Sequence, residues 1–391
     1  MGHRRRWQVG LTAAGAVLAA LLLVGQLWLT LRLQWTTREP LADSLLGLNF
    51  SCDQAEYLLL EEPGAGPDGF ADDGRPGRAE WCAGVLRQLM EETGIRLVRL
   101  SVRWDEVEPE EGRFDFTVIE AELDAVRAMG GGANVSIGMK AQRHPEFYIP
   151  GWALEGVELR EGLVLSEVPA LRARALRMVG TVAAHLAGRP EIDSWTAENE
   201  GYIASHRAHR YSLSQEYVAE VARTIRAADP LGRPVVINHA QHYVFDRRWK
   251  DALADADVLA QSMYPRRNGS LLGRPVVIDI MQLGWLMPNY AHQARVARAQ
   301  GKEFWVTELQ AEPWTDGDAR LISPERPSPN LSPATLRRNV EYARRTGALR
   351  IYLWGAEWWL YQRERYGDGS WLATVRELAA GAPQPGYLAR Q

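Results

Sequence analysis

From about residue 45 onward, short apolar runs alternate with longer segments whose apolar residues are spaced three and four apart. The first pattern is typical of buried strands and the second of amphipathic helices. The strand-like runs are residues 45–50, 95–102, 133–139, 192–197, 233–238, 257–263, 303–309 and 349–355. Eight such runs, each followed by a helical segment, predict an α/β fold whose parallel sheet closes into a (β/α)8 TIM barrel. A doubly wound open sheet is the alternative, but the stretch NFSCDQAEYL is not the Gly-rich phosphate loop that usually follows its first strand.

The first 35 residues follow a different pattern. Residues 9–31 form an apolar run without a charge, which as a helix is long enough to cross a hydrocarbon core of about 30 Å. Three arginines at 4–6 precede it, and the positive-inside rule keeps that end in the cytoplasm. A cleavable signal peptide is the alternative, but its apolar region would be shorter and followed by a small-residue cleavage site. We therefore expect a transmembrane signal anchor in residues 1–35, a linker over 36–44, and an extracytoplasmic barrel domain over 45–385 in a single-pass protein of the cell membrane.

Composition and charge argue against nucleic-acid binding and against a metal site. The 391 residues carry a formal net charge of −4, which leaves no broad basic face for nucleic acid. The two cysteines, Cys52 and Cys82, lie on the predicted outer side, where a disulfide is permitted, but the sequence does not decide whether they approach each other. Two isolated cysteines do not supply a tetrahedral zinc site, and no set of three His or carboxylate residues falls on successive strand ends. The sequence therefore predicts no metal or other cofactor.

Glutamates stand at the ends of two predicted strands. In a (β/α)8 barrel the carboxyl ends of all strands converge on one face, which carries the active site. Asn199 and Glu200 follow the fourth strand, and Glu308 ends the seventh, on the opposite side of the ring. Such a pair suits glycoside cleavage, in which one carboxyl group protonates the leaving oxygen and the other attacks or activates water. Glu198 and Glu312 compete for these roles, and periodicity does not choose between Glu198 and Glu200, because both share one face of an extended strand.

The residues around both glutamates carry a family resemblance. The run WTAENE (195–200) is similar to the Trp-x-x-x-Asn-Glu signature of clan A glycoside hydrolases, the barrel superfamily that includes family 5 cellulases, mannanases and β-galactosidases. The run VTEL (306–309) resembles the strand that carries their nucleophile. The resemblance implies that Glu200 is the acid/base, that Glu308 is the nucleophile and that Asn199 binds the substrate 2-hydroxyl.

Other predicted strand ends fit the same resemblance, which extends over residues 45–380. It implies that Arg99 donates to the nucleophile, that the hydroxyl of Tyr264 touches it, and that Trp354 forms the floor of the sugar site. His144, in the loop after the third strand, is a further candidate for contacting the substrate, with a structural hydrogen bond as the alternative.

Together these features predict an enzyme that hydrolyses β-glycosidic bonds of an oligo- or polysaccharide with retention, through two glutamates. Two alternatives use the same residues differently: a non-catalytic barrel that binds cell-surface polysaccharide, and a transglycosylase with the same pair of glutamates. The sequence leaves open the sugar and its linkage, exo or endo action, and the oligomeric state.

Overall fold

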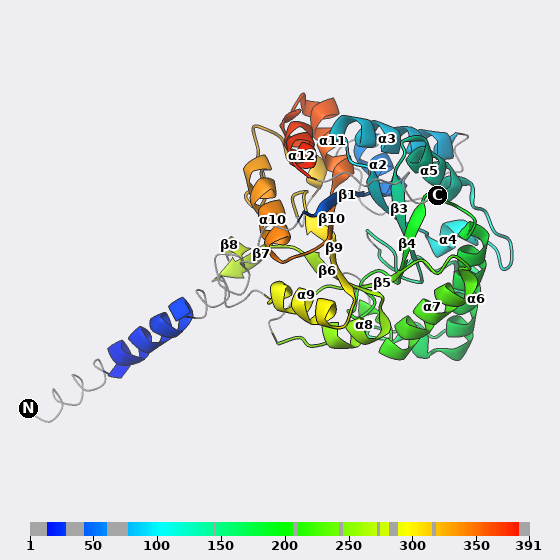
Figure 1. Ribbon diagram of the computed structural model, residues 1–391, viewed down its shortest axis with the longest axis horizontal. Helices are drawn as coiled ribbons and strands as arrows, with labels where there is room; N and C mark the ends of the chain where they lie inside the picture. The colour runs from blue at the N-terminus through cyan, green and yellow to red at the C-terminus, as the bar shows by residue number, and fades with distance from the viewer. Residues whose placement is uncertain are drawn as a thin grey trace, which may run out of the picture.

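The barrel predicted from the alternating pattern is present in the structure, a computed structural model. It describes residues 14–28, 43–60, 77–143, 145–205, 210–241, 245–271, 274–280, 288–314 and 318–382. Eight parallel strands close into a ring in the order β1-β10-β9-β6-β5-β4-β3-β2. Helices surround the ring, as Figure 1 shows. The (β/α)8 fold is therefore confirmed.

The strands of the ring lie within a few residues of the predicted runs. They are β1 (Leu45–Asn49), β2 (Leu97–Ser101), β3 (Gly132–Ile137), β4 (Ile192–Ala197), β5 (Val235–His239), β6 (Val258–Met263), β9 (Glu303–Gln310) and β10 (Arg350–Trp354). The first strand closes the ring by pairing with the last, Leu45 opposite Arg350. Most strand residues are buried, because helices cover the outside of the ring and side chains fill its inside.

The helices begin and end at residues suited to those positions. They are α2 (Cys52–Leu59), α3 (Arg78–Thr93), α4 (Trp104–Val107), α5 (Thr117–Ala128), α6 (Pro169–Leu186), α7 (Gln215–Ala228), α8 (Trp249–Asp255), α9 (Tyr290–Ala299), α10 (Pro333–Arg345), α11 (Ala356–Tyr366) and α12 (Ser370–Ala380), with short 3-10 turns at Gly151–Leu154, Leu165–Glu167 and Ala319–Leu321. Ser332 caps α10 by accepting from the backbone N–H of Thr335, with proline in the first turn, a typical helix start. Gly94 ends α3 at a φ of 74°, a left-handed conformation that favours glycine.

The pattern predicts the helices after the first and last strands at residues 79–94 and 370–381, so α2, the short α4, α11 and one hairpin are absent from the prediction. Residues 358–361 of α11 are all buried, so this helix lacks the polar face that reveals a helix in a sequence. The hairpin consists of β7 (Arg266–Leu271) and β8 (Arg274–Asp279), paired antiparallel outside the ring. It is inserted between β6 and α9, and its stretch RRNGSL has no clear alternation of apolar and polar residues.

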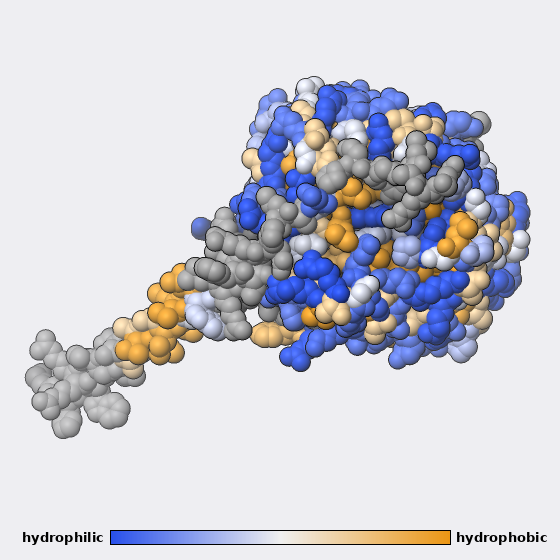
Figure 2. Space-filling view, in the orientation of Figure 1, coloured by the Kyte–Doolittle hydropathy of each residue, from blue (hydrophilic) through white to orange (hydrophobic). Residues whose placement is uncertain are grey.

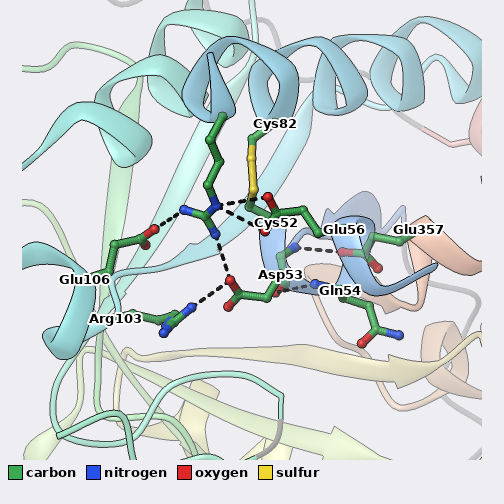
Figure 3. Close-up of a disulfide and its surroundings, with 10 residues drawn as sticks. Cys52, Asp53, Gln54, Glu56, Cys82, Arg103, Glu106 and Glu357 are labelled. Atoms are coloured by element: carbon green, nitrogen blue, oxygen red, sulfur yellow. Dashed lines mark hydrogen bonds and ion pairs between the residues drawn. A yellow bond between two sulfur atoms is a disulfide. The ribbon is translucent and has the colours of Figure 1, made fainter. Parts of the chain in front are cut away.

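A disulfide joins α2 to α3. Cys52 and Cys82 are bonded, with their Cα atoms 5.4 Å apart, which answers the question that the sequence left open. Arg78, the first residue of α3, pairs with Asp53 at 2.8 Å and with Glu56 at 3.0 Å, and Figure 3 shows Asp53 and Glu56 near the disulfide. The disulfide and these ion pairs fix α2 directly after β1, at the end of the barrel where the candidate site lies.

The N-terminal segment is described only over residues 14–28, which form a helix. Its large apolar side chains are exposed, Leu23 by 70%, and Figure 2 shows this apolar segment extending away from the barrel. Among the residues that the structure describes, no helix is long and apolar enough to span a membrane. The structure thus gives no support to the transmembrane helix predicted over 9–31, although the ends of that run lie outside the described residues. The predicted domain boundaries stay predictions.

Candidate active site

The centre of the site is Glu308, near the carboxyl end of β9 and only 3% exposed. Arg99 Nη1 on β2 donates to its Oε1 at 3.0 Å, and the hydroxyl of Tyr264, directly after β6, donates to its Oε2 at 2.7 Å. Burial and the nearby charge of Glu200 raise the pKa of Glu308 to about 7, and the bonds from Arg99 and Tyr264 oppose this rise. Both contacts predicted for Glu308 are therefore present in the structure.

Arg99 connects Glu308 to the ends of two other strands. Its side chain is fully buried, and its guanidinium donates to Asn49 Oδ1 at 3.1 Å and to Asn199 Oδ1 at 2.8 Å. Asn49 ends β1 and Asn199 follows β4, so this cation on β2 holds side chains at three other strands of the ring. A buried charge is tolerated only with such partners.

Glu200 lies directly after β4 in an unusual backbone conformation. Its φ is 48°, in the left-handed region that costs a non-glycine residue free energy and is held by its surroundings. Its backbone N–H donates to Asn238 Oδ1 at 2.9 Å, and its carbonyl oxygen accepts from Lys140 Nζ at 3.3 Å. The side chains of two neighbouring segments thus hold the backbone of Glu200 from both sides, while its charge acts on Glu308.

Glu198 occupies a different position from Glu200. Its carboxylate accepts the backbone N–H groups of Met139 at 2.9 Å and of Lys140 at 2.8 Å, in the segment after β3. It is completely buried, and burial raises the pKa of Glu198 to about 7. Strand β4 ends at Ala197, and both glutamates have a positive φ, so the assumption that they share a face of an extended strand is wrong. Glu198 joins two loops.

Aromatic rings surround Tyr264. Its ring centre lies 5.1 Å from that of Trp314 and 6.5 Å from that of Trp354, the latter edge to face. Burial and the charge of Glu308 raise the pKa of Tyr264 well above its usual value, so its hydroxyl keeps the proton that it donates to Glu308. Trp354, predicted to form the floor of the sugar site, ends β10 and is partly exposed. Aromatic rings of this kind can stack on the apolar face of a sugar.

Arg143, in the segment after β3, is a site residue that sequence reasoning missed. Its guanidinium lies 4.2 Å from the ring centre of Trp354, donates to Glu357 Oε2 at 2.9 Å, and also pairs with Glu312. Glu357 in turn accepts the backbone N–H of Ser51 at 2.7 Å. Nothing in the sequence around Arg143 indicates that it contacts the end of β10. Its neighbour His144, the predicted substrate contact, lies outside the described residues.

Solved structures of similar fold include several glycoside hydrolases. The β-galactosidase of Rahnella sp. R3 is 15% identical with a TM-score of 0.57, over 88% of this chain and 56% of that one. The exo-β-1,4-mannosidase Op5Man5 of Opitutaceae bacterium strain TAV5 is 18% identical with a TM-score of 0.54, over 86% and 60%. The GH5_18 protein of Streptomyces cattleya, solved with GlcNAc, is 14% identical with a TM-score of 0.53, over 88% and 82%. These likenesses concern the fold.

The chain spans little more than half the length of the first β-galactosidases that it matches. No curated protein matches it in sequence. Residues 85–312, however, match the family Glyco_hydro_42, described as β-galactosidase, and this region includes both glutamates of the predicted pair. Because the match extends over more than half of the chain, the chain belongs to glycoside hydrolase family 42, and the resemblance to clan A glycoside hydrolases is confirmed.

Proposed function

We propose that the chain hydrolyses β-glycosidic bonds with retention of configuration, with Glu308 as nucleophile and Glu200 as acid/base. The observation that carries this proposal is the environment of Glu308. A buried carboxylate that accepts bonds from Arg99 and Tyr264 is stabilised as an anion, although the charge of Glu200 raises its pKa. These two donors favour the ionised form of Glu308 and so favour placing the proton that catalysis needs on Glu200.

Each group then has a role in a double displacement. Glu308 attacks the anomeric carbon while Glu200 gives its proton to the leaving oxygen, which forms a covalent glycosyl intermediate. Glu200, now ionised, takes a proton from water, and the resulting attack releases the sugar and restores Glu308. Asn199 accepts a bond from Arg99 at Oδ1 and donates from Nδ2 to the carbonyl oxygen of Ala141 at 3.4 Å, which leaves one amide N–H for the substrate 2-hydroxyl. That bond strengthens as positive charge develops on the ring, so Asn199 should affect rate more than binding.

We propose β-galactosides as the first substrates to test, because the family that the chain belongs to is described as β-galactosidase. The rings of Trp354 and Tyr264 supply apolar surface for one face of the sugar. Mannosides and glucosides belong in the same panel, since one of the similar structures is an exo-β-1,4-mannosidase.

The test is hydrolysis of aryl β-glycosides by the full chain and by the variants Glu200→Gln and Glu308→Gln, which keep the side-chain shape. We expect each variant to lower kcat by about 10⁴-fold or more, as for other groups that act as a unit. Glu312→Gln is the matched control, and should retain far more activity. The first product, followed by NMR, should have the β configuration; an α product would refute retention.

Two other outcomes would favour the alternatives. Tight binding of glycans without cleavage, unchanged in both glutamine variants, would favour a non-catalytic polysaccharide-binding barrel. Products that carry an added sugar acceptor, formed in preference to hydrolysis products, would favour transglycosylation, because the intermediate on Glu308 can react with either water or a sugar hydroxyl.

We also propose that residues 1–35 anchor the protein in the cell membrane, with the barrel outside the cytoplasm. The apolar run 9–31 after the three arginines supports this proposal, and so does the disulfide between Cys52 and Cys82, since disulfides persist in oxidising compartments. The test is fractionation of cells followed by labelling of free thiols. A soluble chain with both thiols reduced would contradict the proposal.

A further inference from the structure

A small pocket lies beside the candidate active site, between the segments that follow β1, β2 and β3 and the helix α5. Its volume is about 30 Å³, which is room for about two water molecules. Ser101, Glu122 and Gln142 line it together with the charged residues Asp53 and Arg103. It is therefore large enough for one or two hydroxyl groups and too small for a whole sugar ring.

Three polar groups in this pocket have no hydrogen-bond partner within the described part of the chain. Ser101 Oγ and Gln142 Nε2 are buried without one, and Gln142 is only 4% exposed. Glu122, 5% exposed, has no hydrogen bond or ion pair there either. Buried polar atoms in proteins are nearly always bonded, so two unbonded ones beside the carboxyl group of Glu122 in a single pocket indicate a bound molecule with several hydrogen-bonding atoms.

The charges around the pocket select the chemistry of that ligand. Arg103 is already paired with Asp53 at 2.6 Å, and Figure 3 shows these two side chains pointing toward each other, with Glu106 on the same side as Arg103. Because the cation is neutralised and carboxylates outnumber it, an anion would be repelled. Burial and the charge of Glu106 raise the pKa of Glu122 well above its usual value, which favours the neutral carboxyl group, a form that can donate a hydrogen bond. Neutral hydroxyl groups fit these surroundings best.

The pocket adjoins the residues that hold the predicted nucleophile. Ser101 lies two positions after Arg99 on β2, so both side chains point to the same face of the strand. Gln142 follows Ala141, whose carbonyl oxygen accepts from Asn199 Nδ2 at 3.4 Å. Ser101 and Gln142 therefore place the pocket next to residues that contact Glu308 and Asn199, the groups that a bound saccharide would touch.

We propose that this pocket binds a hydroxyl or hydroxymethyl arm of the bound saccharide, and that Ser101, Glu122 and Gln142 thereby select which glycosides the chain cleaves. This inference rests on the proposed function. The arm belongs either to the sugar that is cleaved or to a neighbouring sugar of a longer chain, and the two sources share the same chemistry.

The test uses the full chain and three nitrophenyl glycosides. The β-D-galactopyranoside carries a hydroxymethyl group that the α-L-arabinopyranoside lacks on the same ring, and a β-galactobioside adds a second sugar. We expect the unaltered protein to show a kcat/KM about 10-fold or more higher for the substrate that has the arm than for the one that lacks it. The substrate without the arm leaves the hydrogen-bonding groups of the pocket unpaired. Ser101→Ala and Gln142→Ala should each reduce that preference severalfold.

The ratio of kcat/KM for the galactoside to that for the arabinoside shows whether the pocket binds an arm of the cleaved sugar. The ratio of kcat/KM for the galactobioside to that for the galactoside shows whether it binds an arm of the neighbouring sugar. The control is Gln293→Ala, since Gln293 is 2% exposed in α9 and lies outside the pocket; it should lower thermal stability without changing either ratio. Folded Ser101→Ala and Gln142→Ala proteins with both ratios unchanged would overturn the inference alone. Failure of the unaltered protein to cleave any glycoside would instead refute the proposed function, and the inference with it.

Discussion

Gly138→Ala tests whether Glu198 has the structural role described above. Gly138 directly precedes the two backbone N–H groups that Glu198 accepts, and a Cβ atom at this position would overlap the Glu198 carboxyl group. The obstacle is not the far end of a flexible chain, because the bonds from Met139 and Lys140 at 2.9 and 2.8 Å hold the carboxylate in place. The alanine variant must therefore expel the carboxylate and lose both bonds.

The expected cost follows from those bonds. A hydrogen bond to a charged group contributes about 1.5–3 kcal/mol, so losing both should lower the free energy of unfolding by about 3–6 kcal/mol. That is a large part of the 5–15 kcal/mol typical of a domain. The assay is urea unfolding at pH 8, because the pKa of Glu198 is about 7 and its carboxylate is then mostly ionised.

The control is Gly180→Ala in α6, where the nearest atom to a Cβ is Thr224 Cγ2 at 3.5 Å. Gly180→Ala should raise the free energy of unfolding by up to about 1 kcal/mol, because alanine has a higher helix propensity than glycine. The double variant Gly138→Ala/Glu198→Ala should cost less than the sum of the two single changes, because the clash is then gone. A Gly138→Ala protein within about 1 kcal/mol of the unaltered one would refute the reasoning.

Three further predictions concern other contacts of the site. Tyr264→Phe removes a donor to the ionised form of Glu308, so the pKa of Glu308 should rise above about 7 and the acidic limb of the kcat/KM profile should move to higher pH; an unmoved limb would contradict this. Arg143→Met leaves the carboxylates of Glu312 and Glu357 without their cation. It should lower the free energy of unfolding, measured in urea, by about 3–5 kcal/mol, and Arg143→Lys should lower it less. Reduction of the Cys52–Cys82 bond, which closes a loop of 30 residues, should cost about 3–4 kcal/mol by the chain-entropy account, measured by thermal unfolding with and without reductant. The double serine variant should show no effect of reductant.

The sequence predicted the barrel well because its strands have a strong local signal. Each ring strand is a buried apolar run followed by a helical segment, and the two periods differ clearly. The placement of Glu308 at the working face followed from the ring, since the carboxyl ends of parallel strands meet at one face, whereas the contacts of Arg99 and Tyr264 with it were implied by the family resemblance. The roles of Glu200 and Glu308 in catalysis stay predictions until the variants are measured.

The missed features depend on contacts between residues far apart in the chain. Arg143 contacts Glu357, 214 positions away, and no local pattern reports such a pair. The choice between Glu198 and Glu200 depends on left-handed backbone conformations after β4. The sequence predicts an extended strand in this segment, in which such conformations do not occur. Helix α11 was missed because burial on nearly all sides removes the amphipathic pattern.

Closure of the ring determines when the site can exist during synthesis. The side chain of Asn49 donates to the carbonyl oxygen of Thr307, 258 positions later, and the backbone N–H of Ser51 donates to Glu357, 306 positions later. Contacts of such long range form slowly, because a long loop must close before they are gained. The early strands must therefore wait until the last strands have been synthesised before the ring can close. Polar groups that the closed ring pairs, such as the side chain of Asn49, lack these partners for most of that time.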